Sequence, residues 1–173
     1  MLEIGNVYLR ELRSEDRNEY FNWINDRKLV NFNSSFRPVS WSEHCQWFES
    51  IASQNETQIF SIISKKDDIL IGSCSLRNIF QQAKNAELQI RIGVENYRNK
   101  GHGTSAIKLL LQFGFLDLNL KRIYLNVFSN NLAAIKSYEK VGFIKEGLKR
   151  KAVFIEGKYL DVLMMSILDS EYF

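Results

Sequence analysis

The chain has few cysteines, a single proline and no long hydrophobic run. Its two cysteines, Cys45 and Cys74, lack the spacing of a metal site, so we expect two buried or half-buried thiols in a reducing compartment. No stretch reaches the roughly 18 consecutive apolar residues of a membrane span, and the opening ten residues contain Glu3 and no signal-like apolar core. These absences predict a cytoplasmic protein with no membrane partner and no bound metal.

The surplus of positive charge is also small, since 23 Lys and Arg residues against 20 Asp and Glu residues give a net charge of +3. So small and dispersed a surplus predicts no nucleic-acid partner, although it would not repel a polyanionic ligand. The sequence contains no repeat, low-complexity tract or linker, and its 173 residues are 45% hydrophobic, which is enough for one core. We therefore expect one domain over residues 1–173.

The most informative motif is Arg-Asn-Lys-Gly-His-Gly-Thr at residues 98–104, between the alternating segment 87–94 and the amphipathic run 105–118. This order predicts a strand, a basic glycine turn and a helix start, where backbone N–H groups without intrahelical acceptors bind an anion. The glycine spacing fits neither the dinucleotide fingerprint nor the nucleotide P-loop. Alone, the motif also fits an ordinary turn with a helix cap at Thr104.

A second motif occupies residues 131–143, Asn-Leu-Ala-Ala-Ile-Lys-Ser-Tyr-Glu-Lys-Val-Gly-Phe. It predicts a short helix after the strand 122–128, a glycine at the helix end and a new strand at Phe143. Together, Arg-x-x-Gly-x-Gly and Asn-x-x-Ala-Ile-x-x-Tyr-x-x-x-Gly-Phe resemble the signature of the GNAT superfamily of acyl-CoA-dependent N-acyltransferases. The resemblance covers roughly residues 6 to 168.

The resemblance implies an α/β (α+β) GNAT fold with a mixed, mostly antiparallel central sheet of six to seven strands flanked by about four helices. The periodicity agrees with that order of elements. We expect helices starting at Ser14, at Ser40 and after Gly103, and a fourth over 131–140. The expected strands are 6–13, 57–64, 69–76, 86–94, 122–128, 143–154 and 159–168.

The resemblance further implies acetyl-CoA as co-substrate. Coenzyme A carries a diphosphate, which the N–H groups of Lys100 to Thr104 could hold, with Arg98 and Lys100 adding charge unless they form a merely solvated turn. The pantetheine arm is expected along Ile92-Gly93-Val94, with Asn131 and Ala134 beside the cofactor. The full expected set is Ile92, Gly93, Val94, Arg98, Asn99, Lys100, Gly101, His102, Gly103, Thr104, Asn131, Ala134 and Tyr138.

For the chemistry, Tyr138 matches the tyrosine general acid of the family, and a main-chain N–H near Val94 is expected to meet the developing oxyanion. Strand alternation places Glu87, Gln89 and Arg91 on one face. Glu87 can thus act as general base or ammonium ligand, or simply form an ion pair with Arg91. His44 is expected on a helix surface.

The acceptor is expected to be a small-molecule primary amine. The segments 23–26 and 41–48 resemble the front of GNAT enzymes that acetylate amino sugars on nucleotide carriers and, less closely, of aminoglycoside acetyltransferases. This resemblance implies an amino sugar or amino-sugar nucleotide, and the scattered acidic residues do not form the cluster that a polyamine needs. The segments 146–150 and 157–161 are similar to the ending of spermidine and ribosomal-protein N-terminal acetyltransferases, which implies the alternative, a spermidine-like polyamine or a ribosomal-protein N-terminus. An alternative of another class is a non-catalytic CoA-binding sensory module. The aromatic C-terminus and an extra edge strand permit a homodimer.

Overall fold

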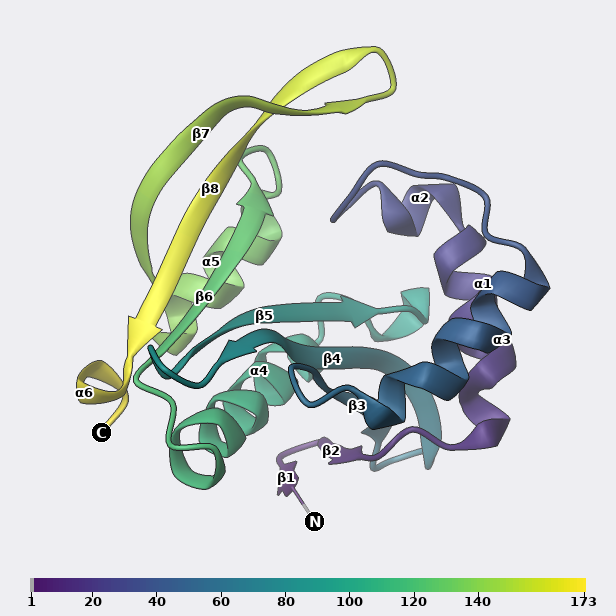
Figure 1. The fold of residues 1–173 in the computed structure, drawn as a ribbon, viewed down its shortest axis with the longest axis horizontal. Helices are drawn as coiled ribbons and strands as arrows, with labels where there is room; N and C mark the ends of the chain where they lie inside the picture. Colours follow the sequence, from purple (N-terminus) through teal and green to yellow (C-terminus); the bar gives the residue numbers. More distant parts are fainter. Residues whose placement is uncertain (1) are drawn as a thin grey trace.

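The computed structural model describes residues 2–173, and Figure 1 shows a twisted sheet whose two halves diverge like the arms of a V. In chain order the elements are β1 (Leu2–Ile4), β2 (Val7–Arg10), α1 (Arg17–Asn25), α2 (Arg27–Val30), α3 (Trp41–Ser50), β3 (Gln58–Ser64), β4 (Ile69–Phe80), β5 (Asn85–Ile92), α4 (His102–Gln112), β6 (Arg122–Phe128), α5 (Leu132–Val141), β7 (Ile144–Ile155), β8 (Lys158–Leu168) and α6 (Asp169–Tyr172). No helix of residues 2–173 has the length and apolarity to cross a membrane.

The sheet order is β1-β2-β3-β4-β5-β6-β8-β7, antiparallel throughout except between β5 and β6. The expected mixed, mostly antiparallel sheet is confirmed, but with eight strands, and six α-helices occur in residues 2–173. The additional strand arises because Gly5, with φ +55°, turns the chain between β1 and β2. Short elements such as β1, α2 and α6 leave too few residues for a periodic pattern.

The V opens between β5 and β6. These parallel strands pair at Asn85↔Arg122, Ala86↔Ile123 and Glu87↔Tyr124. Beyond Glu87, β5 continues beside β4 as far as Ile92, whereas β6 continues beside β8. One edge of each strand therefore faces the opening instead of a neighbouring strand.

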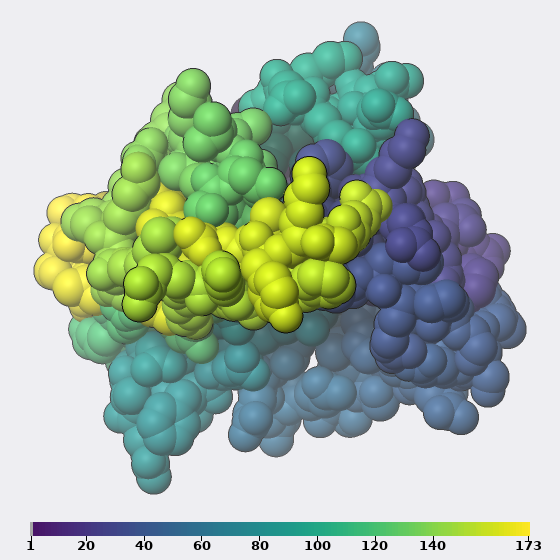
Figure 2. Space-filling model, turned by 90° about the horizontal axis from the view of Figure 1, so that it is seen from above, coloured from purple at the N-terminus to yellow at the C-terminus, as the bar shows by residue number. Residues whose placement is uncertain are grey.

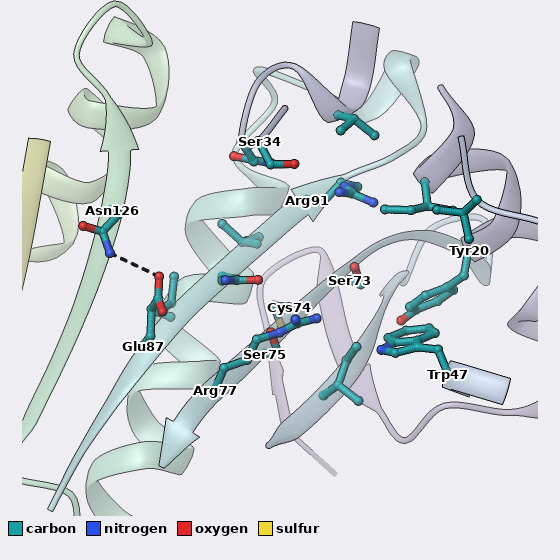
Figure 3. Close-up of a pocket in the computed structure, with 18 of the residues that line it drawn as sticks. Tyr20, Ser34, Trp47, Ser73, Cys74, Ser75, Arg77, Glu87, Arg91 and Asn126 are labelled. Carbon is teal, nitrogen blue, oxygen red and sulfur yellow. Dashed lines mark hydrogen bonds between the residues drawn. The ribbon is translucent and has the colours of Figure 1, made fainter. Parts of the chain in front are cut away.

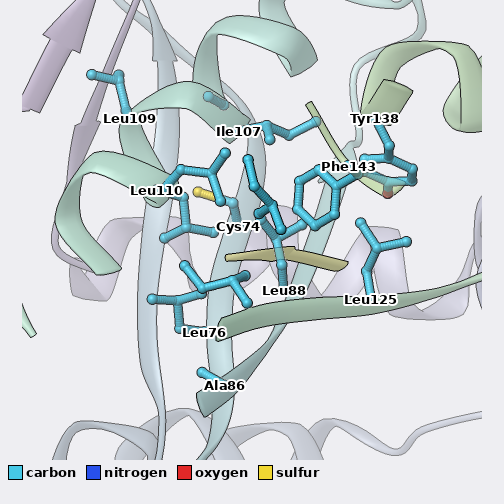
Figure 4. Packing of buried hydrophobic residues seen from close by; sticks show 14 of the residues in the cluster. Cys74, Leu76, Ala86, Leu88, Ile107, Leu109, Leu110, Leu125, Tyr138 and Phe143 are labelled. Carbon is cyan, nitrogen blue, oxygen red and sulfur yellow. The ribbon is translucent and has the colours of Figure 1, made fainter. Parts of the chain in front are cut away.

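A hydrophobic core packs side chains from β4, β5, β6, α4 and α5 together (Figure 4). Among them are Leu76, Leu88, Leu110 and Leu125, and Phe143 joins them from the turn after α5. Burial of each such side chain contributes about 1.5 to 3 kcal/mol. The same packing holds the ring of Tyr138 against Phe143, at 5.7 Å between ring centroids, so α5 presents this tyrosine in a fixed position.

The helices α1, α2 and α3 cover the arm of the V that contains β3 and β4, around a separate cluster of Tyr20, Trp23, Leu29 and Phe48. A buried carboxylate fixes the start of this segment. Asp16 accepts hydrogen bonds from Arg10 Nη1 at 2.7 Å and Nη2 at 2.8 Å, from Ser61 Oγ at 2.8 Å and from the Arg13 N–H at 3.0 Å. These bonds fix the start of α1 against β2 and β3.

The hairpin of β7 and β8 extends across the opening and touches the segment after α2. Figure 2 shows its tip, in yellow-green, against the blue segment near residue 35. Asn31 Nδ2 donates to Glu156 Oε1 at 3.0 Å, and Ser35 Oγ donates to the Phe154 carbonyl at 3.1 Å. The hairpin thereby closes one side of the V.

Candidate active site

Two cavities lie along the opening of the sheet. The larger, of about 550 Å³, lies between β4, β5 and the helices α1 and α3, and the smaller, of about 280 Å³, lies between the end of β5, α4 and α5. Four residues line both cavities: Asn33, Ile90, Arg91 and Tyr138. The two cavities therefore meet beside the phenol of Tyr138.

The smaller cavity contains the start of α4. Gly101 precedes the helix with φ +84°, a conformation that glycine adopts without strain, and the first helical bond runs from Ser105 N–H to the Gly101 carbonyl at 3.0 Å. The N–H groups of His102, Gly103 and Thr104 lie ahead of that bond, and no side chain caps them. The expected alternative of a cap at Thr104 is not what the structure shows, because Gly101 is the N-cap. Such a terminus binds anions.

Most of the expected cofactor residues line this cavity: Ile92, Arg98, Asn99, Gly101, Gly103, Thr104, Asn131, Ala134 and Tyr138. Gly93, Val94, Lys100 and His102 do not line it. The His102 ring is buried, with Nδ1 3.1 Å from the Tyr97 carbonyl oxygen, so it supports the turn from behind. The sequence interpretation missed Ala133 and Ser137; Ser137 lies three residues after Ala134, a spacing that puts both on one helix face and could have revealed it.

The backbone around Gly93 and Val94 bears on the expected oxyanion donor, while the expected path of the pantetheine arm along Ile92, Gly93 and Val94 stays a prediction. Their N–H groups both donate to the Ile71 carbonyl, at 2.9 and 3.2 Å, so the Val94 N–H is not free for an oxyanion. A Cβ on Gly93 would lie 2.0 Å from the Trp23 ring, which explains the glycine without any ligand. Because backbone groups alternate along a strand, those of Ile90 and the N–H of Ile92 face the opening instead, while the Ile92 carbonyl accepts from Arg98 Nε.

Arg98 and Asn131 have structural partners as well as places at the cavity. Arg98 donates from Nε to the Ile92 carbonyl at 3.0 Å and from Nη2 to the Gly93 carbonyl at 2.9 Å, so it clamps the end of β5. Asn131 caps α5, with Oδ1 accepting from the Ala134 N–H at 3.3 Å. The Arg98 charge still lies beside the anion-binding turn.

Tyr138 carries a neutral phenol at the junction of the cavities. Its side chain is 8% exposed, and burial raises its pKa to about 12. Its hydroxyl forms no hydrogen bond to any group of residues 2–173. The O–H is therefore free to donate to a group placed between the two cavities.

Glu87 lines the larger cavity beside Gln89 and Arg91, which confirms the predicted face of β5. Its carboxylate accepts from Asn78 Nδ2 at 3.1 Å and from Asn126 Nδ2 at 3.2 Å (Figure 3). Within residues 2–173, Glu87 forms no ion pair within 4 Å, so the proposed pairing with Arg91 is wrong. The bond to Asn126 bridges β5 and β6 just beyond their backbone pairing.

The expectation that His44 lies on a helix surface is also wrong. The side chain is 3% exposed, its Nε2 lies 2.9 Å from the Arg17 carbonyl oxygen, and its ring stacks on Trp47. It lines the larger cavity together with Tyr20 and Trp47. The side of α3 that carries it packs on α1, a tertiary contact that helical periodicity alone does not reveal.

Within residues 2–173, no group of three or more His, Cys, Asp or Glu side chains could hold a metal ion. The site instead consists of an anion-binding helix terminus, a cleft between splayed strands and a second cavity, all meeting at one phenol. Such an arrangement has room for two ligands, one at the helix terminus and one in the larger cavity. Residues 6–144 match the family model described as acetyltransferase (GNAT) domain, and the chain belongs to this family.

The relatives agree with this assignment. The chain is 32% identical to the uncharacterized N-acetyltransferase p20 of Bacillus licheniformis over 95% of this chain and 93% of that protein. It is also 32% identical to spermidine N(1)-acetyltransferase of Vibrio cholerae, over 95% and 94% of the two chains. A crystal structure of the Vibrio cholerae spermidine N-acetyltransferase with CoA and spermine superimposes with a TM-score of 0.91 at 31% identity, covering 96% of this chain and 98% of that one.

These findings make the chain an acetyl-CoA-dependent N-acetyltransferase. The residues of the smaller cavity fit such a co-substrate, because the uncapped N–H groups of α4 suit its diphosphate. The open backbone edge of β5 suits the amides of its pantetheine arm. The alternative of a non-catalytic sensory module has no support in these comparisons.

Proposed function

We propose that the chain transfers the acetyl group to the primary amine of a small molecule by direct attack, with both substrates bound at once. The observation that carries this proposal is that Tyr138 lines both cavities. The smaller cavity holds the thioester substrate and the larger holds the amine. Tyr138 donates its hydroxyl proton towards the leaving sulfur, and Glu87 accepts a proton from the amine or holds it as an ammonium ion.

The pKa of Tyr138 decides how it can act. A phenol of pKa about 12 and a reference thiol of pKa about 8.5 differ enough that complete proton transfer to the thiolate costs roughly 5 kcal/mol. Tyr138 therefore contributes mainly by hydrogen bonding to the sulfur as negative charge develops, in surroundings where burial strengthens that bond. As the N–C bond forms, the C–S bond of the thioester breaks, and the sulfur receives the proton that the amine nitrogen loses.

The comparisons favour a polyamine over an amino sugar as the acceptor class, because the relatives whose names state a substrate act on spermidine. In this chain the larger cavity has two acidic residues, Glu43 and Glu87. Glu43 is ion-paired with Arg37, which leaves Glu87 to receive an ammonium group. A homodimer stays a prediction.

Release of free thiol from acetyl-CoA tests the proposal. The purified chain, mixed with acetyl-CoA and a panel of spermidine, spermine, simple diamines, amino sugars and amino-sugar nucleotides, should release thiol and form an acetylated amine detectable by mass spectrometry. Binding of acetyl-CoA by calorimetry with no turnover of any amine would contradict the proposed reaction.

Glu87→Gln separates a catalytic role from a structural one. If Glu87 is the base, we expect kcat to fall by about 10²-fold or more and the pH–rate profile to change, with the midpoint of denaturant unfolding unchanged. If Glu87 only holds the ammonium group, KM for the amine rises and kcat is kept. Lower stability with unchanged kinetics would assign it to bracing β5 against β6 through Asn126.

A further inference from the structure

Two arginines of the larger cavity contact no carboxylate of residues 2–173, although Glu87 lies opposite Arg77 in the β4–β5 ladder. Arg77 comes from β4 and Arg91 from β5, and Figure 3 shows both side chains extending toward the side formed by Tyr20 and Trp47. Neither forms an ion pair within 4 Å in residues 2–173. Arg77 donates from Nε to Ser75 Oγ at 3.2 Å, whereas Arg91 Nε is buried without any partner.

The other half-buried arginines of residues 2–173 are engaged. Arg10 forms a two-pronged bond with Asp16, Arg122 does so with Glu146, and Arg17 Nη2 lies 3.4 Å from Glu49. Arg98 donates to two carbonyl groups. Among residues 2–173 the buried side-chain nitrogens without a hydrogen-bond partner are Arg17 Nε, whose guanidinium still reaches Glu49, and Arg91 Nε, whose guanidinium has no carboxylate within 4 Å.

Electrostatics within the cavity favour an incoming anion. Burial and then the positive charge of Arg77 lower the pKa of Arg91, and burial lowers the pKa of Arg77, which Glu87 partly offsets. Guanidinium groups nevertheless stay charged near neutral pH. Arg77 and Arg91 lie four residues apart along the β4–β5 ladder, about 13 Å, so one oxyanion reached by both long side chains would lie between them.

We propose that Arg77 and Arg91 form a subsite for an oxyanion, a carboxylate or a phosphate, carried by the acceptor amine. The inference rests on the proposed function and narrows its substrate class. Glu87 and Tyr138 receive the amine, and the two arginines bind the acidic group of the same molecule. A polycation such as spermidine would meet two positive charges here, so this subsite favours an anionic amine over the polyamine class that the relatives' names suggest.

Matched probes test the subsite. We would compare kcat/KM for 1,4-diaminobutane, spermidine, 4-aminobutanoate and 4-aminobutyl phosphate, each with saturating acetyl-CoA. The two anionic amines should exceed the diamine by about tenfold or more, because a charge-assisted hydrogen bond contributes that much. The carboxylate and phosphate probes distinguish the two kinds of oxyanion. A preference for spermidine over both anionic amines would overturn the proposal.

Variants assign the preference to the arginines. Arg77→Gln and Arg91→Gln should each reduce the anionic-to-diamine ratio by about tenfold through KM for the amine, with KM for acetyl-CoA unchanged. Lys66→Gln, in the exposed turn between β3 and β4, removes an equal charge far from the cavity and should leave the ratio unchanged. Arg77→Glu should raise kcat/KM for spermidine. Thermal unfolding confirms that each variant is folded.

The outcomes separate the subsite from the proposed function. Acetylation of amines with a ratio that neither glutamine variant changes overturns the subsite and leaves the transferase intact. If KM for acetyl-CoA rises in Arg91→Gln but not in Arg77→Gln, the subsite is also overturned. Arg91 would then act in the smaller cavity, because it lines both cavities whereas Arg77 lines the larger one. Binding of acetyl-CoA with no acetylation of any amine overturns both.

Discussion

Tyr138→Phe should lower kcat by about 10²-fold or more and leave the KM values for acetyl-CoA and amine nearly unchanged. The hydroxyl has no partner in residues 2–173, so its removal leaves no unpaired polar group, and the phenyl ring keeps its packing on Phe143. The loss then reports the bond to the departing sulfur. Steady-state kinetics with thiol detection measure it, and denaturant unfolding should show a free energy within about 0.5 kcal/mol of wild type.

Tyr8→Phe is a matched control, because it removes a hydroxyl bonded to Asp68 on the outer side of the sheet and should not alter kcat. An undiminished kcat in Tyr138→Phe would remove this tyrosine from the chemistry.

The burial of Tyr138 also predicts how kcat depends on pH. Since the pKa of Tyr138 is raised to about 12, the phenol keeps its proton, and kcat should not fall between pH 8 and pH 10 through its ionisation.

Asp16→Asn should destabilise the protein by about 3 to 5 kcal/mol, because it leaves Arg10 half-buried without its carboxylate. Burial alone raises the pKa of Asp16, but bonds from Arg10, Arg13 and Ser61 outweigh it, and the net pKa is lowered. The folded protein therefore binds the proton more weakly than the unfolded chain. The carboxylate stabilises the fold above the unfolded pKa of about 3.9, and this contribution is lost as pH falls through the folded pKa.

Chemical unfolding of wild type and Asp16→Asn from pH 7 to pH 3 measures this prediction. The gap between the two free energies should be constant near neutral pH and narrow below about pH 4. Glu15→Gln, at an exposed neighbouring position, serves as control and should change stability by less than about 0.5 kcal/mol. An equal acid dependence in wild type and Asp16→Asn would show that the Asp16 network is not the source.

The order of elements could be predicted because the long strands and helices carry clear periods of two and 3.6 residues. The face shared by Glu87 and Arg91 follows from that period, but their pairing does not. Four residues along a strand span about 13 Å, whereas direct cross-strand neighbours lie about 5 Å apart. Glu87 therefore lies closer to Arg77, directly opposite it on β4, than to Arg91 on its own strand.

The lining of the larger cavity was not predictable, because much of it depends on distant contacts. The loop containing Ser34 and Ser35 has no periodic pattern, and the Ser35 hydroxyl bonds to Phe154, 119 residues away. The close packing of the Trp23 indole against Gly93 is likewise invisible in the sequence. Local rules place residues on elements, and only the packed fold shows what each one faces.

The short pairing between β5 and β6 has a further consequence for how the molecule responds to its substrates. Between β5 and β6 the two arms of the V are joined by three residue pairs and by side-chain packing, so these two strands should separate more easily than the rest of the sheet. A thioester substrate bound between β5 and β6 would contact both strand edges, as an added strand does. Occupancy at 100 times its Kd would add about 2.7 kcal/mol of stability, and the slowing of amide exchange should concentrate on the facing edges of β5 and β6.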